Sequence, residues 1–496
     1  MKRRLLSSFG RLAAVVVALT MMPAMARADV EINEANFPDP AFRQWLQSMW
    51  FGENGVLKDE DIKNIETIDV SYNRNIQSLK GIEYFTALRL LLCTDNQLTA
   101  LDVSANKALD VLICDNNQLT ELDVSSNTAL IEVSCNYNQL TALDVSGCTA
   151  LQELYCYHNQ LTALDLSANT ALERLVCYSN PLHSLDVSAN KALWELSCSE
   201  NQLTALDVSS NKALRNFDCG ENQLTALDIS SNTALEFLNC SYNQLTALDV
   251  SANTALNTLY CGDNQLAKLD LSANKALIDL ICYNNQLTEL DVSAHRALEF
   301  LRCDDNQLSS LDLSGCSALV ELACGYNQLT ELDVSVCTAL DRLFCEFNQL
   351  SSLDISANTL LQYLNCYGNK IRGAEMDALI DGLSDRVGQT SAGELIVFIE
   401  VGNPDDNADG NVCTKEQVER AKAKNWKVYK YNPLYIDDVR WYYTKTEYEG
   451  ADPESVSSLQ ADEADAPVYD LGGRRLQGQP RHAGIYLKGG KKIVYR

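Results

Sequence analysis

Cysteine is the residue type whose number and spacing first suggest chemistry in this chain of 496 residues. Fourteen of its 18 cysteines recur every 21 residues without a single insertion. A disulfide needs converging Cβ atoms about 3.8 Å apart, whereas equivalent side chains on neighbouring parallel strands point the same way about 4.8 Å apart. We therefore expect free, buried thiols that pack as small apolar groups. The members of this structural ladder are Cys93, Cys114, Cys135, Cys156, Cys177, Cys198, Cys219, Cys240, Cys261, Cys282, Cys303, Cys324, Cys345 and Cys366.

A second column lies thirteen residues after each ladder cysteine and holds Asn in most repeats. Cys148, His295, Cys316 and Cys337 replace the Asn in four of them. Zinc is one interpretation, but a straight row gives poor tetrahedral geometry and no fourth ligand is visible. A disulfide between Cys316 and Cys337, or simple variation at a turn position, are the alternatives. We predict no metal and no cofactor.

Aspartate forms a third column, nine residues after each ladder cysteine, from Asp102 to Asp354. Carboxylates stacked at strand spacing repel one another unless they are solvated or hydrogen-bonded. We expect them to accept hydrogen bonds from neighbouring Ser, Thr and backbone groups. A row of weakly held calcium ions is the alternative.

Catalytic motifs are absent from the sequence. It contains no G-x-S-x-G, H-E-x-x-H, P-loop or dinucleotide-binding pattern. Of its four histidines, His158 lies in the variable half of a repeat, His183 and His295 lie on turns or in the uniform half, and His482 lies near the C-terminus. We predict that the protein is not an enzyme.

Aromatic residues gather in the half of the repeat that surrounds the cysteine, where the outward positions vary from copy to copy. The other half, Gln-Leu-Thr-x-Leu-Asp-Val-Ser, is nearly uniform and carries no aromatic residue. Tyr and Trp offer large contact areas with a polar tip, which suits protein surfaces and sugar rings. Ordinary packing across a sheet is the alternative. The candidate partner-binding residues are Tyr137, Tyr155, Tyr157, His158, Tyr178, Trp194, Tyr242, Tyr260, Tyr283, Tyr326, Phe344, Phe347 and Tyr367.

The strict period of 21 residues predicts the fold that positions these side chains. The unit spanning 235–256 reads LEFLNCSYNQLTALDVSANTAL, and its L-x-x-L-x-C-x-x-N-x-L spacing is typical of leucine-rich repeats. Leu238 and Cys240 alternate about Asn239, as in a short parallel strand, and Asn243 is placed to cap the following turn. We predict a β-rich solenoid, a right-handed coil of short parallel strands with an α-helical N-terminal cap, an α/β C-terminal cap and a small β tail domain.

Cysteine-ladder leucine-rich repeat proteins, the internalin-like surface proteins among them, resemble this chain over residues 30–435. The resemblance implies an adhesive or partner-binding role and identifies no ligand. The expected domains are a signal peptide (1–28), an N-terminal cap (29–75), the solenoid (76–370), a C-terminal cap (371–445), an acidic linker (446–466) and a C-terminal tail (467–496).

Charge and the two ends of the chain bear on where the protein acts. Its formal net charge of −28 argues against nucleic acid and bare anionic membrane as partners. Basic residues at 2–4 and an apolar run at 12–22 predict a secretory signal, and that run is too short to span a bilayer. No later stretch is long and apolar enough, so we expect no transmembrane segment in the mature chain.

The tail carries Val-Tyr-Asp-Leu-Gly-Gly-Arg-Arg-Leu at 468–476, Gly-Ile-Tyr at 484–486 and a Lys-Lys ending. It resembles the C-terminal sorting domain of type IX secretion cargo. That resemblance implies recognition by the secretion machinery, passage across the outer membrane, and either release or attachment to the cell surface. The sequence as a whole predicts an exported surface protein that binds a protein partner in adhesion or in host or community interaction. A glycan-binding surface protein and a structural surface-layer component are the alternatives.

Overall fold

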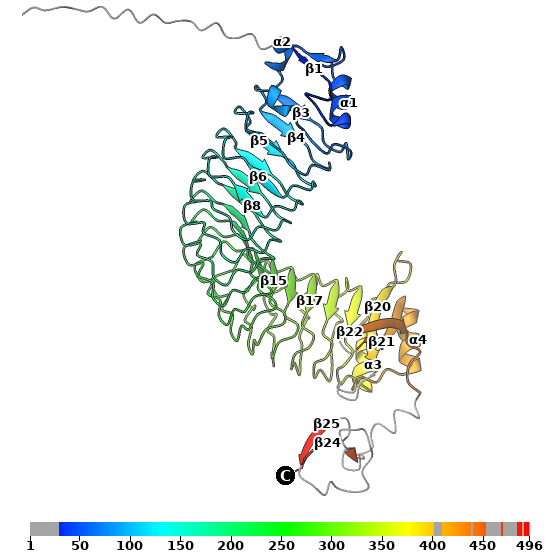
Figure 1. Cartoon of the computed structure of the whole chain (residues 1–496). Helices are drawn as coiled ribbons and strands as arrows, with labels where there is room; N and C mark the ends of the chain where they lie inside the picture. Colours follow the sequence, from blue (N-terminus) through cyan, green and yellow to red (C-terminus); the bar gives the residue numbers. More distant parts are fainter. Residues whose placement is uncertain are drawn as a thin grey trace, which may run out of the picture.

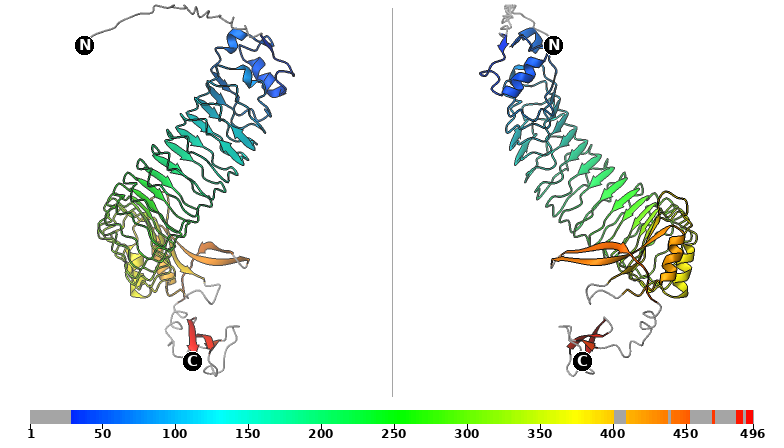
Figure 2. Two further views of the ribbon diagram at one scale, coloured as in Figure 1. Left: turned by 60° about the vertical axis from the view of Figure 1, so that its left-hand side comes forward. Right: turned by 90° about the vertical axis from the view of Figure 1, so that its right-hand side faces the viewer.

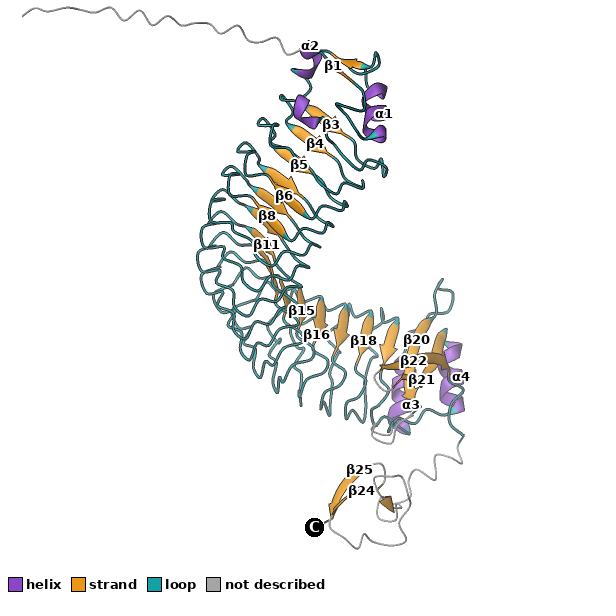
Figure 3. Ribbon diagram, viewed as in Figure 1, coloured by secondary structure: helices purple, strands orange, loops and turns teal. Residues whose placement is uncertain are grey.

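The repeats stack into a curved solenoid. The computed structural model describes residues 29–400, 409–437 and 440–452, with residues 468–469, 484–488 and 491–495. The expected signal peptide lies outside these residues, as does most of the expected linker. Strands lie along the inner side of the arc, and turns and loops form its outer side (Figure 1, Figure 3).

Each coil contributes one short strand to a continuous parallel sheet. Successive strands pair with a shift of one repeat, so that Leu175 lies opposite Leu196. The strands are β3 (Thr67–Asp69), β4 (Leu90–Leu92), β5 (Val111–Ile113), β7 (Glu132–Ser134), β9 (Glu153–Tyr155), β10 (Arg174–Val176), β11 (Glu195–Ser197), β12 (Asn216–Asp218), β13 (Phe237–Asn239), β14 (Thr258–Tyr260), β15 (Asp279–Ile281), β16 (Phe300–Arg302), β17 (Glu321–Ala323), β18 (Arg342–Phe344) and β19 (Tyr363–Asn365). A smaller parallel pair, β6 (Glu121–Asp123) and β8 (Ala142–Asp144), lies in the uniform half of two coils.

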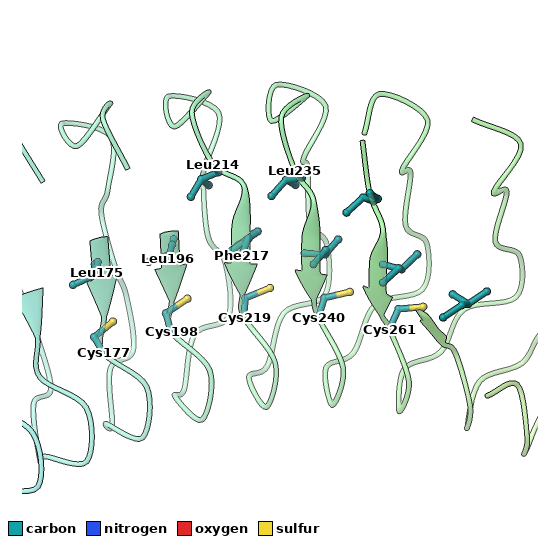
Figure 4. Packing of buried hydrophobic residues seen from close by; sticks show 14 of the residues in the cluster. Leu175, Cys177, Leu196, Cys198, Leu214, Phe217, Cys219, Leu235, Cys240 and Cys261 are labelled. Carbon is teal, nitrogen blue, oxygen red and sulfur yellow. The ribbon is translucent and has the colours of Figure 1, made fainter. Parts of the chain in front are cut away.

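The core is a set of inward columns that run the length of the solenoid. Figure 4 shows Leu175 and Leu196 beside Cys177 and Cys198, with the thiols of successive coils pointing the same way. All 18 cysteines are buried and free, as predicted for the ladder. No coil buries such a set alone, so stacking creates the continuous core.

Asparagine three residues after each ladder cysteine ties every coil to the one before it. The amide of Asn117 donates to the carbonyl oxygens of Cys93 and Cys114, at 3.0 and 3.1 Å, and to that of Asp115 at 3.1 Å. Its oxygen accepts from the backbone N–H of Leu98 at 3.0 Å. The turn after each strand leaves these groups without strand partners, and the asparagine satisfies them. This confirms the capping role expected from the sequence.

Helices and short strands close the N-terminal end. The elements are β1 (Val30–Glu31), α1 (Pro40–Ser48), β2 (Val56–Leu57), α2 (Asp59–Ile62) and the 3₁₀ helix η1 (Ile82–Tyr84). Asp39 caps α1, its carboxylate accepting from the N–H groups of Ala41 and Phe42 at 2.8 and 2.9 Å. Phe42 and Leu46 are fully buried on the helix face that covers the first coil.

The C-terminal end is closed by α3 (Ala374–Gly382), β20 (Gly393–Ile399), α4 (Lys415–Ala423), β21 (Trp426–Asp437) and β22 (Arg440–Glu447). The first four lie within residues 371–445, the range where the sequence predicts an α/β cap. Strand β22 is missing from the sequence prediction; it pairs antiparallel with β21 in a hairpin that projects from the body (Figure 2). Asn411 continues the asparagine ladder into this cap, donating to the carbonyl of Cys366 at 2.8 Å and accepting from the N–H of Ile371 at 2.8 Å.

The tail strands lie where the sequence places them. They are β23 (Val468–Tyr469), β24 (Gly484–Lys488) and β25 (Lys491–Tyr495), and they form an antiparallel sheet. Within the described part of the chain, no helix has the length and apolar character needed to cross a bilayer.

Candidate binding surface on the strand face

We use the term strand face for the outward residues of β3–β5, β7 and β9–β19, the strands of the continuous sheet, together with the first two residues after each ladder position. It lies on the inner side of the arc, along which the strands run (Figure 1). All thirteen aromatic and histidine candidates come from this half of the repeat.

The second residue after each ladder cysteine has a left-handed backbone. From Asp95 to Phe347 its φ lies between 47° and 57° in every coil. Gly, Asn and Asp adopt this conformation readily, whereas other residues do so at a cost of about 1–3 kcal/mol. Tyr137, Tyr242 and Phe347 nevertheless occupy it. Since every coil adopts this conformation whatever residue it holds, the fold of the repeat imposes it.

The N-terminal aromatic cluster consists of Tyr137, Tyr157, His158 and Tyr178. Tyr157 and Tyr178 stack with ring centroids 4.5 Å apart and planes inclined by 10°. Tyr137 and His158 stack at 4.4 Å and 21°, and Tyr137 meets Tyr157 edge-on at 5.4 Å. The exposed fraction of Tyr137 is 46%, and the other three are partly exposed. Three consecutive coils thus build one contiguous aromatic surface.

Arg174 holds two further candidates beside this cluster. Its guanidinium lies 5.3 Å from the ring centroids of both Tyr155 and Trp194. It also pairs with Glu195 at 2.7 Å and with Glu153 at 3.3 Å. Since cation–π contacts and ion pairs hold these side chains together, their arrangement is set before any partner arrives.

The central candidates are Tyr242, Tyr260 and Tyr283. The hydroxyl groups of Tyr242 and Tyr283 lie 3.0 Å apart although the residues are two coils apart. The Tyr260 hydroxyl donates to the carboxylate of Asp279 at 2.6 Å. Arg302 lies 5.2 Å from the Tyr283 ring centroid. The exposed fraction of Tyr242 is 50%, so its ring is open to solvent.

The C-terminal candidates divide between surface and core. Tyr326 and Phe347 lie 4.6 Å apart between ring centroids, and the exposed fraction of Tyr326 is 39%. Phe344 lies 5.0 Å from Tyr363. Tyr367 requires a correction: its exposed fraction is 5%, because Phe347 and the C-terminal cap enclose it. It supports the surface from beneath and presents no ring to a partner.

Several acids of the strand face are partly buried, which the sequence does not reveal. Burial raises the pKa of Glu346 to about 7, and the nearby carboxylates of Asp304 and Asp305 act in the same direction. Gly325 makes room for it, since a Cβ at that position would lie 2.9 Å from the Glu346 carboxyl carbon. Burial also raises the pKa of Asp218, which accepts three hydrogen bonds.

The aspartate column is exposed and hydrogen-bonded as predicted. The Asp207 carboxylate accepts from the N–H of Ser209 at 2.9 Å, and the same contact recurs in the other coils. These bonds to Ser209 lower the pKa of Asp207. Within the described residues, no three His, Cys, Asp or Glu side chains form a group that could hold a metal ion.

The second column is a buried ladder of its own, within the turns that each coil makes there. Asn127 donates to the carbonyls of Val103 and Asn106, both at 2.9 Å. Cys148 and Cys316 donate to the carbonyls of Val124 and Val292, at 3.2 and 3.3 Å. His295 contacts the carbonyl of Leu271 at 3.2 Å through Nε2. Cys337 is likewise buried, and its thiol is free. Cys and His replace Asn here because each can reach a carbonyl of the preceding coil.

Burial also governs the chemistry of the ladder thiols. It raises the pKa of Cys177 and of Cys261 to about 12. A thiolate is the reactive form of cysteine, so these thiols are inert in the folded chain.

No protein-family model matches the sequence, and no curated protein matches it. Solved structures do. The functional domain of InlJ from Listeria monocytogenes, described as including a cysteine ladder, is 29% identical, covers 86% of this chain and 94% of that domain, and superposes with a TM-score of 0.69. A leucine-rich repeat protein of Leptospira interrogans is 25% identical over 65% of this chain and 95% of its own, with a TM-score of 0.57.

An internalin, InlF of Listeria monocytogenes, shares the fold at 24% identity and a TM-score of 0.57, over 70% of this chain and 99% of that one. The protein is therefore a leucine-rich repeat solenoid. Its fold is that of the internalin-like structures, cysteine ladder included.

Proposed function

We propose that this chain is an exported surface protein that binds a protein partner through its strand face. The observation that carries the proposal is the N-terminal aromatic cluster. There, side chains from three coils form one partly exposed surface on the inner side of the arc. Tyrosine is enriched at the energetic centres of protein interfaces, which supports a protein as the partner. The solenoid fold supports the same role, because stacked repeats create an extended concave surface that repeat proteins use for binding.

Preorganisation adds to this argument. The aromatic rings and Arg174 already hold one another in the free protein, so binding orders few additional side chains. Carboxylates of Glu153, Glu195 and Glu200 surround the rings. The surface therefore fits a partner that presents basic groups, which would also accelerate encounter.

Export through the type IX route is the second part of the proposal. It rests on the tail motifs, the antiparallel tail sheet and the basic leader sequence. Deleting residues 467–496 should leave the protein in the periplasm, as fractionation and surface immunolabelling would show. Normal surface appearance of the truncated protein would refute this route and leave the binding proposal untouched.

The binding proposal is tested with the recombinant chain from Asp29 onward on arrays of extracellular-matrix and cell-surface proteins. The comparison variant is Tyr137→Ser/Tyr157→Ser/Tyr178→Ser. Tyr72→Ser is a matched control, since Tyr72 has the same left-handed backbone, a φ of 61° and an exposed fraction of 70%, but lies on an earlier coil. A protein captured by the wild type and by the control, but not by the triple variant, supports the proposal. Equal capture by all three would contradict it.

A further inference from the structure

A pocket opens on the strand face between the N-terminal and C-terminal aromatic groups. Its volume is about 320 Å³, within the range of small-ligand sites. Six of its lining residues carry the argument: Asp218, Asn239, Tyr242, Tyr260, Tyr283 and Arg302. We refer to it as the central pocket.

Its floor is a line of polar side chains fixed by mutual hydrogen bonds. The carboxylate of Asp218 accepts from the hydroxyl of Ser199 at 3.1 Å and from the amide of Asn239 at 2.9 Å. It also accepts from the N–H of Gly220 at 3.1 Å, and Asn239 accepts from the N–H of Ser241 at 3.0 Å.

This network leaves hydrogen-bonding capacity toward the pocket. A carboxylate has about four acceptor positions, of which Asp218 uses three, and the amide of Asn239 has one N–H in use out of two. The floor therefore offers both an acceptor and a donor whose positions are already set.

Tyrosine rings form the walls, and a missing side chain makes their arrangement possible. A Cβ on Gly262 would lie 3.1–3.3 Å from the Tyr283 ring, so glycine lets that ring lie across the coil without a tight contact. The hydroxyl of Tyr283 thereby reaches that of Tyr242 at 3.0 Å. Tyr242 keeps half of its surface exposed beside the polar floor.

Tyrosine rings beside a carboxylate and an amide match the two kinds of surface that a sugar presents. A sugar ring has an apolar face of C–H groups that packs on an aromatic ring, and hydroxyl groups that both donate and accept hydrogen bonds. The carboxylates of Glu200, Asp218 and Glu221 outnumber Arg302 around the pocket, which disfavours anionic ligands.

We propose that the central pocket binds a saccharide that is neutral or bears an amine. Its residues lie on coils separate from the N-terminal aromatic cluster, so the site is additional to the protein-binding surface. Tyr242 packs on the face of the sugar ring, and Asp218 and Asn239 hold its hydroxyl groups.

The test uses the chain from Asp29 onward with three tetrasaccharide probes, namely cellotetraose (neutral), the glucosamine tetramer (amine-bearing) and tetragalacturonate (anionic). Binding is measured by calorimetry and by saturation-transfer difference NMR. Tyr242→Ala and Asp218→Asn are the pocket variants. Tyr72→Ala is the matched control, because Tyr72 has a left-handed backbone and an exposed fraction of 70% and lies outside both proposed sites.

Binding of cellotetraose or the glucosamine tetramer by the wild type and the control, weakened at least about tenfold in Tyr242→Ala, is the expected result; this corresponds to about 1.4 kcal/mol. Asp218→Asn should weaken binding too, and thermal melting should show that Tyr242→Ala folds normally. Three outcomes overturn the proposal: no binding of either probe by the wild type, equal loss in the control, or preference for tetragalacturonate. Loss of protein capture by the triple tyrosine variant has no bearing on this result.

Discussion

Tyr157 and Tyr178 stack face to face on adjacent coils, with ring centroids 4.5 Å apart and planes inclined by 10°. The contact follows from the exact repetition of the coil, because residues one period apart lie side by side on a parallel sheet. Tyr137 and His158 stack in the same way on adjacent coils, at the next position of the repeat. The repeat therefore converts a column of aromatic residues into a continuous surface.

Removing one asparagine of the first ladder should destabilise the solenoid. Asn201→Ala deprives the carbonyls of Cys177, Cys198 and Ser199 of a donor and the N–H of Leu182 of its acceptor. The three carbonyls keep other donors, in Asn180, Asn222 and the N–H of Ser179, so the N–H of Leu182 is the group left unsatisfied. A buried unsatisfied group costs about 1–3 kcal/mol, and we expect a loss of about 3 kcal/mol. The midpoint of urea unfolding measures it, with exposed Thr204→Ala as the control. Equal midpoints for both variants would contradict the role of the ladder.

The ladder thiols should be free and unreactive in the folded protein. Because burial raises the pKa of Cys177 to about 12, alkylation at pH 8 should label almost no cysteine until denaturant is added. Denatured, unreduced protein should then yield all 18 thiols. Recovery of fewer than half of them would show that disulfides bridge the coils.

Alkaline pH should destabilise the fold through the same thiols. Their pKa is higher in the folded chain than the ordinary value of 9.0, so above about pH 9 the unfolded chain loses protons that the folded chain retains. The contribution of the thiols to stability should be constant below that pH and should fall from pH 9 toward pH 12. Thermal melting across this range measures it. Cys261→Ala should reduce the slope, and an unchanged slope would count against burial as the cause.

Glu346 should reduce stability at neutral pH. Its pKa is raised to about 7 in the folded chain from the ordinary 4.5, so the charged form is disfavoured there and stability falls as pH rises from 4.5 through 7. Glu346→Gln should therefore stabilise the protein by about 2 kcal/mol at pH 8 and by little at pH 4. Chemical unfolding at the two pH values measures the difference. The exposed Glu331→Gln change is the control and should show no such dependence.

The sequence predicts the solenoid well because its period is strict. Leu238 and Cys240 alternate about Asn239 in one coil, and Asn243 marks the turn that follows. The equivalent three positions recur in every coil and define its structure. Irregular parts are harder to predict. Asn411 continues the asparagine ladder only after an insertion breaks the period, and β22 lies beyond the last repeat.

The candidate surface is less predictable, because exposure depends on contacts between coils. Tyr367 shares a column with the partly exposed Tyr157 and Tyr178, yet contacts with Phe347 and Tyr431 bury it. The left-handed column was detectable in principle: Asp, Asn and Gly recur there, as Asp95, Asn116 and Gly368 illustrate. The central pocket could not be predicted from the sequence, because its residues come from separate coils.

The affinity of the captured protein partner tests the central claim most directly. We expect the dissociation constant of the Tyr137→Ser/Tyr157→Ser/Tyr178→Ser variant to exceed that of the wild type by at least about a hundredfold, or about 2.7 kcal/mol, as for the loss of an interface hot spot. Tyr72→Ser should bind within about twofold of the wild type. Surface plasmon resonance of the three proteins measures these constants. A triple variant that binds as tightly as Tyr72→Ser would show that the strand-face aromatic cluster is not the binding site.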